Sequence, residues 1–483
     1  MHMKFSIIAT SDIHGHTERF SQLASIIKDR QPALLIDNGD FLQGSHLSYF
    51  YENIQQCEHP QISMANALQY DVAVFGNHEF NYPLPAIEAM RNACNFPWIA
   101  ANIEAFAKDY IVKDMDGFRV AVIGVVTHFT PLWEEGTATK SLQFEQAFDA
   151  AQRTVKYVRA HEQVDFVILC YHGGFERDLQ TGHLIDLQEG ENEGYRMLHE
   201  IDGIDLFITG HQHLEIATKI NGVSVVQPGA NANCFAQIDV TIDGDSMTHE
   251  PMLVYVDEAL PSFSDSAFDH WKNEVIGESA CDLQYSDFFT PRLMQTTYVQ
   301  LLHDMQRHYT KAQLSVIELP YHQNGGFPKQ ITRKDVLHNL PRQNQLVKIE
   351  MTGAEIRQAL ELSASVFAIN TQNEIDFSMN VLYPQPQPFI YDLWGGLDYD
   401  ICLSHPVGQR VVSCIYKGQE IQDHDIFSVV INSYRATGAH DYAMFHKTPL
   451  YKTSKFVPEL MMTYIQNNRP LQIQIKNHFR MRK

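Results

Sequence analysis

The stretch Gly76-Asn77-His78-Glu79-Phe80-Asn81 directly follows the apolar run Asp71-Val72-Ala73-Val74-Phe75. The run has the length and residue types of a buried β-strand. An amide, an imidazole and a carboxylate therefore stand side by side where that strand must end. In an α/β sheet, ligands bind beyond the carboxyl ends of the strands. The stretch indicates a functional site at one edge of a sheet.

The same pattern recurs four more times in the first half of the chain. In each case a short apolar run that predicts a strand is followed by carboxylate or imidazole side chains. These are Asp12 with His14 after 5–9, Asp40 after 33–36, His172 after 166–170, and His211 with His213 after 206–209. A lone histidine at a strand end is more often structural, but five such segments in this order favour a metal site.

Carboxylate, amide and imidazole ligands suit Mn²⁺, Fe²⁺ or Zn²⁺ without any thiolate. One carboxylate between two cations can bridge them, and Asp40 is the natural candidate. Two ions about 3.5–4 Å apart can clamp phosphate oxygens and supply a metal-bound hydroxide as nucleophile. His78, beside Asn77, need not be a ligand, since it could stabilise charge on the phosphate or protonate the leaving oxygen.

Two domains and a connection between them are expected. Strands alternate with amphipathic helices through the first half, which predicts a layered α/β domain over residues 1–257. A linker or helical connection is expected over 258–292. In the second half, Thr352 and Glu355 form a capping-box pattern among shorter apolar runs, which favours a smaller α+β domain over 293–483.

The composition excludes several classes of protein. The net charge of −22 argues against coating a nucleic-acid polymer, which needs a basic surface. Seven cysteines without a CxxC pair predict neither a disulfide framework nor a thiolate zinc site. The sequence contains no run of about 18 apolar residues, so we expect no membrane span. A first strand that begins almost at residue 1 leaves no room for a signal peptide, so a cytoplasmic location is expected, although a leader removed before Met1 would not be visible.

These motifs together resemble a known enzyme family. Asp12-Ile13-His14, Gly39-Asp40, Gly76-Asn77-His78-Glu79, His172-Gly173 and Gly210-His211-Gln212-His213 resemble the signature of calcineurin-like metallophosphoesterases. With a C-terminal domain of this size, the chain resembles the bacterial 5′-nucleotidase family, which includes UDP-sugar hydrolases and 2′,3′-cyclic-nucleotide 2′-phosphodiesterase/3′-nucleotidases. The resemblance implies a four-layer α/β/β/α sandwich for the first domain.

The resemblance also implies roles for individual residues. One divalent ion would be held by Asp12, His14, Asp40 and His213, and a second by Asp40, Asn77, His172 and His211, with His78 catalytic. In the family, two aromatic rings of the C-terminal domain sandwich the nucleobase, and Tyr391 and Tyr434 are the matching positions. Such stacking is worth about 1–3 kcal/mol per base. Asn324, in an Asn-Gly-Gly turn, matches a segment that lines the same pocket.

Two departures from the family pattern bear on the substrate. Many 5′-nucleotidases have an aspartate three residues after the catalytic histidine, where this chain has Asn81. An asparagine can hold the ring by a hydrogen bond but cannot stabilise an imidazolium as a carboxylate does. Asn81 and the segment Tyr434-Arg435-Ala436 are similar to the cyclic-phosphodiesterase branch. An arginine often found after the Asn-Gly-Gly turn is missing, which leaves Lys329, Arg333 or Arg435 to recognise an anion.

The sequence therefore predicts a dimetal phosphoesterase that hydrolyses nucleotides. The substrates would be 5′- or 3′-monophosphates and/or 2′,3′-cyclic nucleotides, and Asn81 favours cyclic and 3′ substrates. One alternative is hydrolysis of a UDP-sugar or another nucleotide pyrophosphate. An alternative of another class is a nucleotide-binding sensor without activity, against which the complete ligand set argues. The oligomeric state does not follow from the sequence.

Overall fold

The computed structural model describes residues 2–133, 138–185, 190–244, 246–320, 323–342, 344–382, 391–438 and 442–483. The chain divides into two compact units, Met1–Asp265 and Ser266–Lys483. This division falls later than residue 257, where we expected the first domain to end. Much of the expected connection over 258–292 belongs to the second unit, because strands formed by its residues pair with later strands of that unit.

The first unit contains two six-stranded sheets. The first sheet has the order β12 (Ser246–Tyr255), β11 (Cys234–Asp243), β1 (His2–Thr10), β2 (Leu34–Asp37), β3 (Val72–Val74) and β4 (Trp98–Ile99). The second has the order β5 (Tyr110–Met115), β6 (Phe118–Val126), β7 (Phe166–His172), β8 (Leu206–Thr209), β10 (Val223–Pro228) and β9 (Glu215–Ile220). Strands β1 to β4 are parallel, and so are β6, β7, β8 and β10. Their carboxyl ends therefore share an edge within each sheet.

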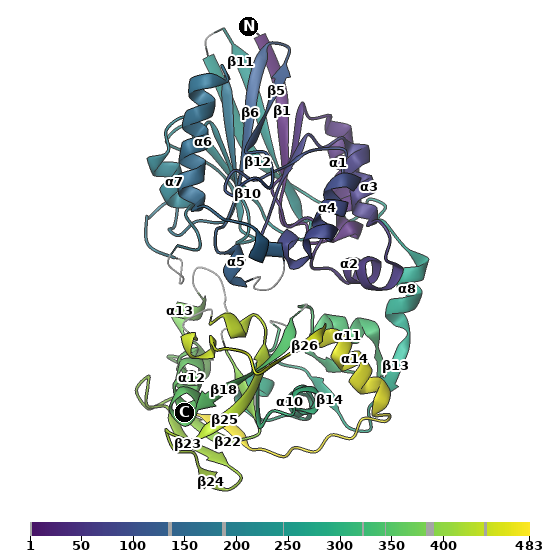
Figure 1. Ribbon diagram of the computed structural model, residues 1–483, viewed down its shortest axis with the longest axis vertical. Coiled ribbons are helices and arrows are strands. Elements are labelled where there is room, and N and C mark those ends of the chain that lie inside the picture. The colour runs from purple at the N-terminus through teal and green to yellow at the C-terminus, as the bar shows by residue number, and fades with distance from the viewer. Residues whose placement is uncertain are drawn as a thin grey trace. The chain divides into compact units, whose positions relative to one another are not determined.

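Helices cover the outer face of each sheet (Figure 1). Helices α1 (Thr17–Arg30), α3 (Pro60–Leu68) and α4 (Leu84–Ala93) pack on the first sheet, whereas α6 (Ala147–His161) and α7 (Gly194–Glu200) pack on the second. Strand β1 shows how the layers form: Ile8 packs against α1, while Ile7 and Ala9 pack between the two sheets. The predicted four-layer α/β/β/α sandwich is confirmed.

Short helical elements occupy the loops of this unit. They are α2 (His46–Phe50), η1 (Tyr51–Gln55), η2 (His78–Asn81), α5 (Thr130–Trp133) and η3 (Ala138–Ser141). Strands β5, β9 and β12 were not predicted, because each mixes polar, partly exposed residues with apolar stretches of at most four residues. Strands β1, β2, β3, β7 and β8 match the apolar runs that precede the predicted ligands.

The second unit is built around a five-stranded sheet with the order β21 (Leu393–Gly395), β15 (Leu314–Ile317), β25 (Ile426–Asn432), β18 (Gln345–Thr352) and β26 (Tyr451–Phe456). A four-stranded sheet has the order β24 (Gln419–Glu420), β23 (Val411–Tyr416), β22 (Asp398–Cys402) and β27 (Phe479–Arg482). The described residues of this unit also form three two-stranded sheets: β13 (Val275–Glu278) with β17 (Gln330–Thr332), β14 (Leu283–Tyr285) with β16 (Gly325–Phe327), and β19 (Phe367–Ile369) with β20 (Ile375–Phe377).

Helices α8 (Ser266–Asn273), α9 (Thr290–Leu293), α10 (Thr297–Thr310), α11 (Arg333–Asn339), α12 (Gly353–Ser365), α13 (Met379–Leu382) and α14 (Val457–Asn467) belong to the same unit, with the short elements η5 (Arg435–Thr437) and η6 (Ala443–Phe445). The predicted capping box opens α12, since Thr352 Oγ1 accepts from the Glu355 amide and Glu355 accepts from the Thr352 amide. The mixture of mainly antiparallel sheets and separate helices confirms the predicted α+β class.

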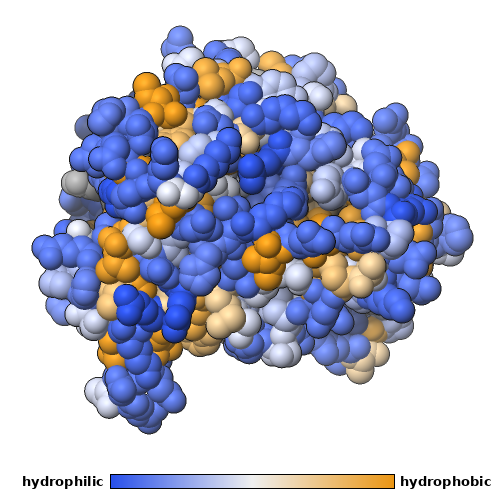
Figure 2. All heavy atoms as spheres, turned by 90° about the horizontal axis from the view of Figure 1, so that it is seen from below, coloured by the Kyte–Doolittle hydropathy of each residue, from blue (hydrophilic) through white to orange (hydrophobic). Residues whose placement is uncertain are grey.

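The exposed face of the second unit in Figure 2 is mainly hydrophilic. Its hydrophobic side chains form small groups among polar ones, which is ordinary for a protein surface. Within the described ranges, none of the helices combines the length and the hydrophobicity that crossing a bilayer requires.

Candidate metal centre

Five of the seven predicted ligands have an unusual backbone conformation. The φ angles are 52° for Asp12, 51° for His14, 55° for Asp40, 67° for His211 and 59° for His213. Residues with a side chain adopt positive φ rarely, and such residues cluster where a protein positions functional groups. Here the left-handed turns follow strands β1, β2 and β8.

The turns bring the side chains of the ligands together. On one side, His14 Nε2 lies 3.0 Å from His213 Nε2, and His213 Nε2 lies 3.5 Å from Asp12 Oδ1. On the other, His172 Nε2 lies 3.1 Å from Asp40 Oδ2 and 3.9 Å from Asp12 Oδ1. In each of the groups Asp12/His14/His213 and Asp12/Asp40/His172, all candidate ligand atoms lie within 4.8 Å of one another.

The remaining two predicted ligands, Asn77 and His211, meet at the same place. Nδ1 of His211 lies 3.0 Å from Oδ1 of Asn77. The backbone amide of His211 donates to Asp12 Oδ1 at 3.0 Å, and the His211 ring lies edge-on to that of His172 with centroids 5.9 Å apart. The structure thus gathers all seven predicted ligands from five segments of the chain.

The ring nitrogens show that these residues fit divalent cations. Nδ1 of His14 lies 2.9 Å from the Gln43 carbonyl, and Nδ1 of His172 lies 2.6 Å from the Asn38 carbonyl. A ring nitrogen beside a carbonyl carries the hydrogen, so Nε2 of the neutral ring is left as an acceptor. Nε2 of His172 is buried, and its near neighbour, Asp40 Oδ2 at 3.1 Å, is itself a predicted ligand. A cation is the partner that such converging acceptors require.

The electrostatics of the centre also favour positive charge. Burial of Asp40 opposes ionisation, but the imidazoles of His172 and His78 hold the pKa of that carboxyl well below its usual range. Burial lowers the pKa of His14 to about 4. Burial acts in the same direction on His172, yet Asp40 and Asp12 overcome it and raise the pKa of His172 to about 10. Positive charge is therefore favoured between the two carboxylates, where a bound cation would supply it.

Glu79 holds the loops of the centre together, a role that the sequence did not reveal although the residue stands in the deciding stretch. Its buried carboxylate accepts from the amides of Asp40 at 2.9 Å, Phe41 at 2.8 Å and Gly76 at 2.7 Å. Gly76 must be a glycine here, because a Cβ would lie 2.2 Å from Asp40 Oδ1. The loops after β2 and β3 are thereby fixed against each other.

His78 and Asn81 lie beside these ligands on the short helix η2. Nδ1 of His78 is 2.7 Å from Oδ1 of Asn81, and the His78 amide donates to Asp40 Oδ1 at 2.8 Å. The His78 ring lies edge-on to that of His14, with centroids 5.4 Å apart. Because Nδ1 donates to Asn81, Nε2 is the nitrogen that remains for a substrate. The catalytic roles of both residues stay predictions.

Two of the four predicted substrate residues lie in the interior of the second unit. Tyr391 is 2% exposed and its hydroxyl donates to the Arg292 carbonyl at 2.7 Å. Arg435 is also 2% exposed and forms an ion pair with Asp392 at 2.9 Å. In this structure, therefore, neither the Tyr391 ring nor the Arg435 guanidinium lies at a surface where a ligand could reach it.

The other two predicted substrate residues are more accessible. Asn324 is exposed immediately before β16, whose first residue, Gly325, was expected in a turn but pairs with Tyr285. Tyr434 is half-buried after β25, and the Arg342 guanidinium lies 5.9 Å from the centre of its ring. Of the other basic side chains considered for anion recognition, Arg333 pairs with Glu274, whereas Lys329 is exposed. Tyr434 and Asn324 remain the candidates for binding a nucleoside.

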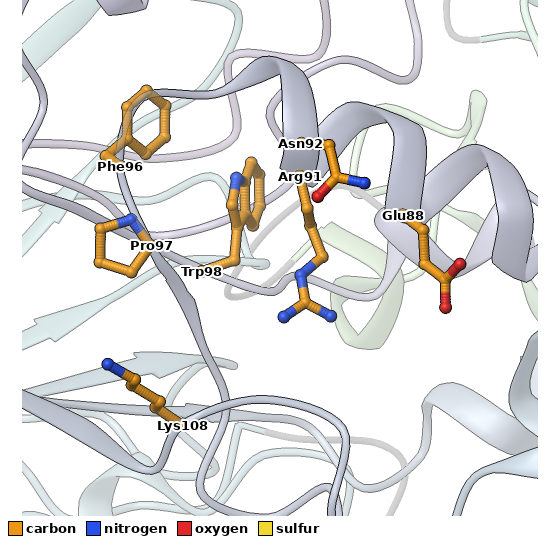
Figure 3. A pocket seen from close by; sticks show the side chains of 7 residues that line it. All are labelled: Glu88, Arg91, Asn92, Phe96, Pro97, Trp98 and Lys108. Atoms are coloured by element: carbon orange, nitrogen blue, oxygen red, sulfur yellow. The ribbon is translucent and has the colours of Figure 1, made fainter.

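A separate pocket of about 380 Å³ lies beside α4 and β4. Figure 3 shows its lining residues, which are Glu88, Arg91, Asn92, Phe96, Pro97, Trp98 and Lys108. The guanidinium of Arg91 donates to the Phe106 carbonyl at 3.1 Å, so its charge is partly engaged by the protein. None of the predicted site residues lines this pocket.

Comparisons with known proteins agree with this geometry. Residues 5–215 match the model of the calcineurin-like phosphoesterases, and residues 275–447 match that of the 5′-nucleotidase C-terminal domain. The trifunctional nucleotide phosphoesterase protein YfkN of Bacillus subtilis is 24% identical over 90% of this chain, which spans only 36% of that protein. A 2′,3′-cyclic-nucleotide 2′-phosphodiesterase/3′-nucleotidase of Yersinia enterocolitica is 24% identical over 89% of this chain and 80% of its own.

A solved structure extends the likeness to the whole fold. It is a Staphylococcus aureus protein assigned as a 5′-nucleotidase and crystallised in complex with α-ketoglutarate. It superimposes with a TM-score of 0.92 at 28% identity, and the match covers 100% of both chains.

Proposed function

Because the chain belongs to the 5′-nucleotidase family, in which a calcineurin-like phosphoesterase domain precedes a 5′-nucleotidase C-terminal domain, we propose that it hydrolyses phosphate esters of nucleotides with two divalent metal ions. The observation that carries this proposal is the convergence of seven oxygen and nitrogen donors from five segments of the chain at one edge of the first unit. The names of the relatives, which include cyclic-nucleotide phosphodiesterases and 5′-nucleotidases, support a nucleotide substrate.

The residues divide into two sets around the shared Asp40. We assign Asp12, His14, Asp40 and His213 to one ion, and Asp40, Asn77, His172 and His211 to the other. When bound, two such ions neutralise phosphate oxygens and make water a better nucleophile near neutral pH. Glu79 and the carbonyls of Asn38 and Gln43 hold the donor atoms in place before substrate arrives.

His78 is the residue that we assign to the leaving group. Asn81 accepts from Nδ1 and orients the ring, so that Nε2 can stabilise or protonate the departing oxygen. Since Asn81 carries no charge, it stabilises a protonated His78 less than an aspartate would. Asn81 is also a position at which the chain resembles the cyclic-phosphodiesterase branch, which supports the expected preference for 2′,3′-cyclic and 3′ phosphates.

Tyr434 is the residue of the second unit that we assign to the nucleobase, with Asn324 as a polar contact. The partial exposure of Tyr434 supports this role, and stacking on one ring tolerates different bases. Tyr391 and Arg435 are buried in this structure, and their predicted contact with the substrate stays a prediction. The choice among manganese, zinc and iron and the cytoplasmic location remain predictions.

A substrate panel with metal reconstitution tests the proposal. The full chain, freed of metal by a chelator, is given Mn²⁺, Zn²⁺ or Fe²⁺ and then 5′-, 3′- and 2′,3′-cyclic nucleotides and a UDP-sugar. We expect metal-dependent release of phosphate or a ring-opened product, strongest for cyclic and 3′ substrates. Faster hydrolysis of the UDP-sugar would favour the pyrophosphate alternative. Binding of nucleotide without any hydrolysis would favour the sensor.

A further inference from the structure

The histidines of the metal centre differ in what lies behind their rings. His14 and His172 each place the nitrogen that faces away from the centre against a backbone carbonyl, of Gln43 and Asn38 respectively. His211 instead places Nε2 3.0 Å from a carboxylate oxygen of Glu191. Its other nitrogen, Nδ1, faces Asn77. His211 therefore has a charged carboxylate behind its ring, whereas His14 and His172 have neutral backbone carbonyls.

Glu191 is held in position by its own backbone. Its carbonyl accepts from the hydroxyl of Thr127 at 2.9 Å and from the hydroxyl of Tyr171 at 3.3 Å, two residues at the carboxyl ends of β6 and β7. Its side chain is 18% exposed and that of His211 is 16% exposed, so water screens their interaction only partly. The backbone of Glu191 is thus anchored to the sheet, and its side chain reaches His211 from a mostly buried position.

A second contact fixes the same ring. The indole of Trp133, at the end of α5, stacks on His211 with centroids 5.3 Å apart and an interplanar angle of 18°. The stack defines the plane of the imidazole, and the carboxylate defines its rotation within that plane. Together they leave Nδ1 directed at Asn77 and at the centre.

We propose that Glu191 is a positioning residue that directs His211 Nδ1 toward the metal centre and strengthens it as a ligand, so that the ion at Asn77 and His172 is bound more tightly than it would be with a neutral partner. This inference rests on the proposed function insofar as the centre binds divalent ions. A carboxylate behind a ligating histidine fixes its tautomer and raises its basicity, and losing such a partner typically weakens metal binding about 10–100-fold.

Metal titration of matched variants tests this inference without measuring activity. Glu191→Gln keeps the size and an oxygen acceptor but removes the charge. Glu193→Gln, two residues along, makes the same charge change at a carboxylate that contacts the Phe148 amide and none of the predicted ligands. Each full-length protein is stripped of metal, titrated with Mn²⁺ by calorimetry and electron paramagnetic resonance, and checked for folding by thermal unfolding.

We expect Glu191→Gln to bind one of two Mn²⁺ ions about 10-fold or more weakly and the other as before, with Glu193→Gln like the unmodified chain. Unchanged affinity for both ions in a folded Glu191→Gln protein would overturn the inference, and so would equal weakening by both variants. If Glu191→Gln unfolds, Glu191→Asp provides the test, because it keeps the charge and should retain both ions more tightly than Glu191→Ala; equal ion binding by those two variants would overturn the inference.

This test separates the inference from the proposed activity. Loss of one ion in Glu191→Gln, in a protein that hydrolyses no nucleotide, would support the positioning role and refute the activity. Normal ion binding by Glu191→Gln, in a chain whose unmodified form hydrolyses nucleotides, would refute the positioning role and leave the activity in place.

Discussion

The buried charged groups of the metal centre and those beside Tyr391 differ in the partners that surround them. In the first unit, the carboxylates of Asp12 and Asp40 converge with imidazoles that donate their Nδ1 hydrogens away from the centre. In the second unit, the buried Asp392 faces the buried Arg435, and the two charges compensate each other. Carboxylates and imidazole nitrogens that converge on one point are typical of a site for a cation from solution, whereas a closed pair of one cation and one anion serves the fold.

The largest effect should come from the carboxylate that both ion sites share. Asp40→Asn keeps the size of the side chain but removes the charge that the two sites need. We expect the metal content to fall and hydrolysis to drop by more than the roughly 10²–10⁴-fold that follows loss of a single general acid or base. Metal analysis and initial rates measure both. A variant that kept two ions and its activity would contradict the role of Asp40.

The next effect should separate chemistry from metal binding. His78→Ala removes the ring that Asn81 orients but none of the seven predicted ligands. We expect kcat to fall about 10²–10⁴-fold while two ions remain bound. His199→Ala is a suitable control, because that histidine is exposed on α7. Undiminished turnover, or loss of an ion with His78, would remove it from the role of a catalytic residue.

The metal ligands could be predicted from the sequence, whereas the contacts of Glu79 and the burial of Tyr391 could not. The ligands could be found because each stands just past an apolar strand, and parallel strands bring their carboxyl ends together. The role of Glu79 could not be found, because it depends on which amides of distant loops turn toward it. The burial of Tyr391 could not be found either, since an aromatic residue beside a strand has the same local pattern inside or outside a core.

The central strands of the layered fold could be predicted from the sequence, but edge strands such as β9 could not. Strands such as β7 are buried along their whole length and read as continuous apolar runs. Strand β9, at the edge of the second sheet, alternates exposed and half-buried residues, but its residue types, Glu-Ile-Ala-Thr-Lys-Ile, do not alternate in step, so its sequence carries little signal. In the second unit, the short paired strands depend on contacts between distant segments, such as Tyr285 with Gly325.

The compensated pair of the second unit makes a stability prediction. Arg435→Met leaves Asp392 buried opposite an apolar side chain, and removing one partner of a buried ion pair typically costs about 3–5 kcal/mol. We expect the second unit to unfold at lower denaturant, with two ions still bound by the first. Adding Asp392→Asn should recover part of the loss, because no buried charge is then left unpaired. Equal stability of Arg435→Met and the unmodified chain would show that the pair is not needed.

The smallest effect distinguishes the two tyrosines by what each contacts. Tyr434 is half-buried after β25, so Tyr434→Ala should weaken nucleotide binding by about 1–3 kcal/mol, the usual worth of one stacked base, with little change in stability. Tyr391→Phe removes only the hydroxyl that donates to the Arg292 carbonyl, so it should lower the free energy of unfolding by about 0.5–1.5 kcal/mol and leave nucleotide binding unchanged. Calorimetric titration with a nucleotide and denaturant unfolding measure the two quantities on each variant. If Tyr391→Phe weakened binding at unchanged stability, the buried ring would have to reach the ligand through a rearrangement, and the division between the two tyrosines would be wrong.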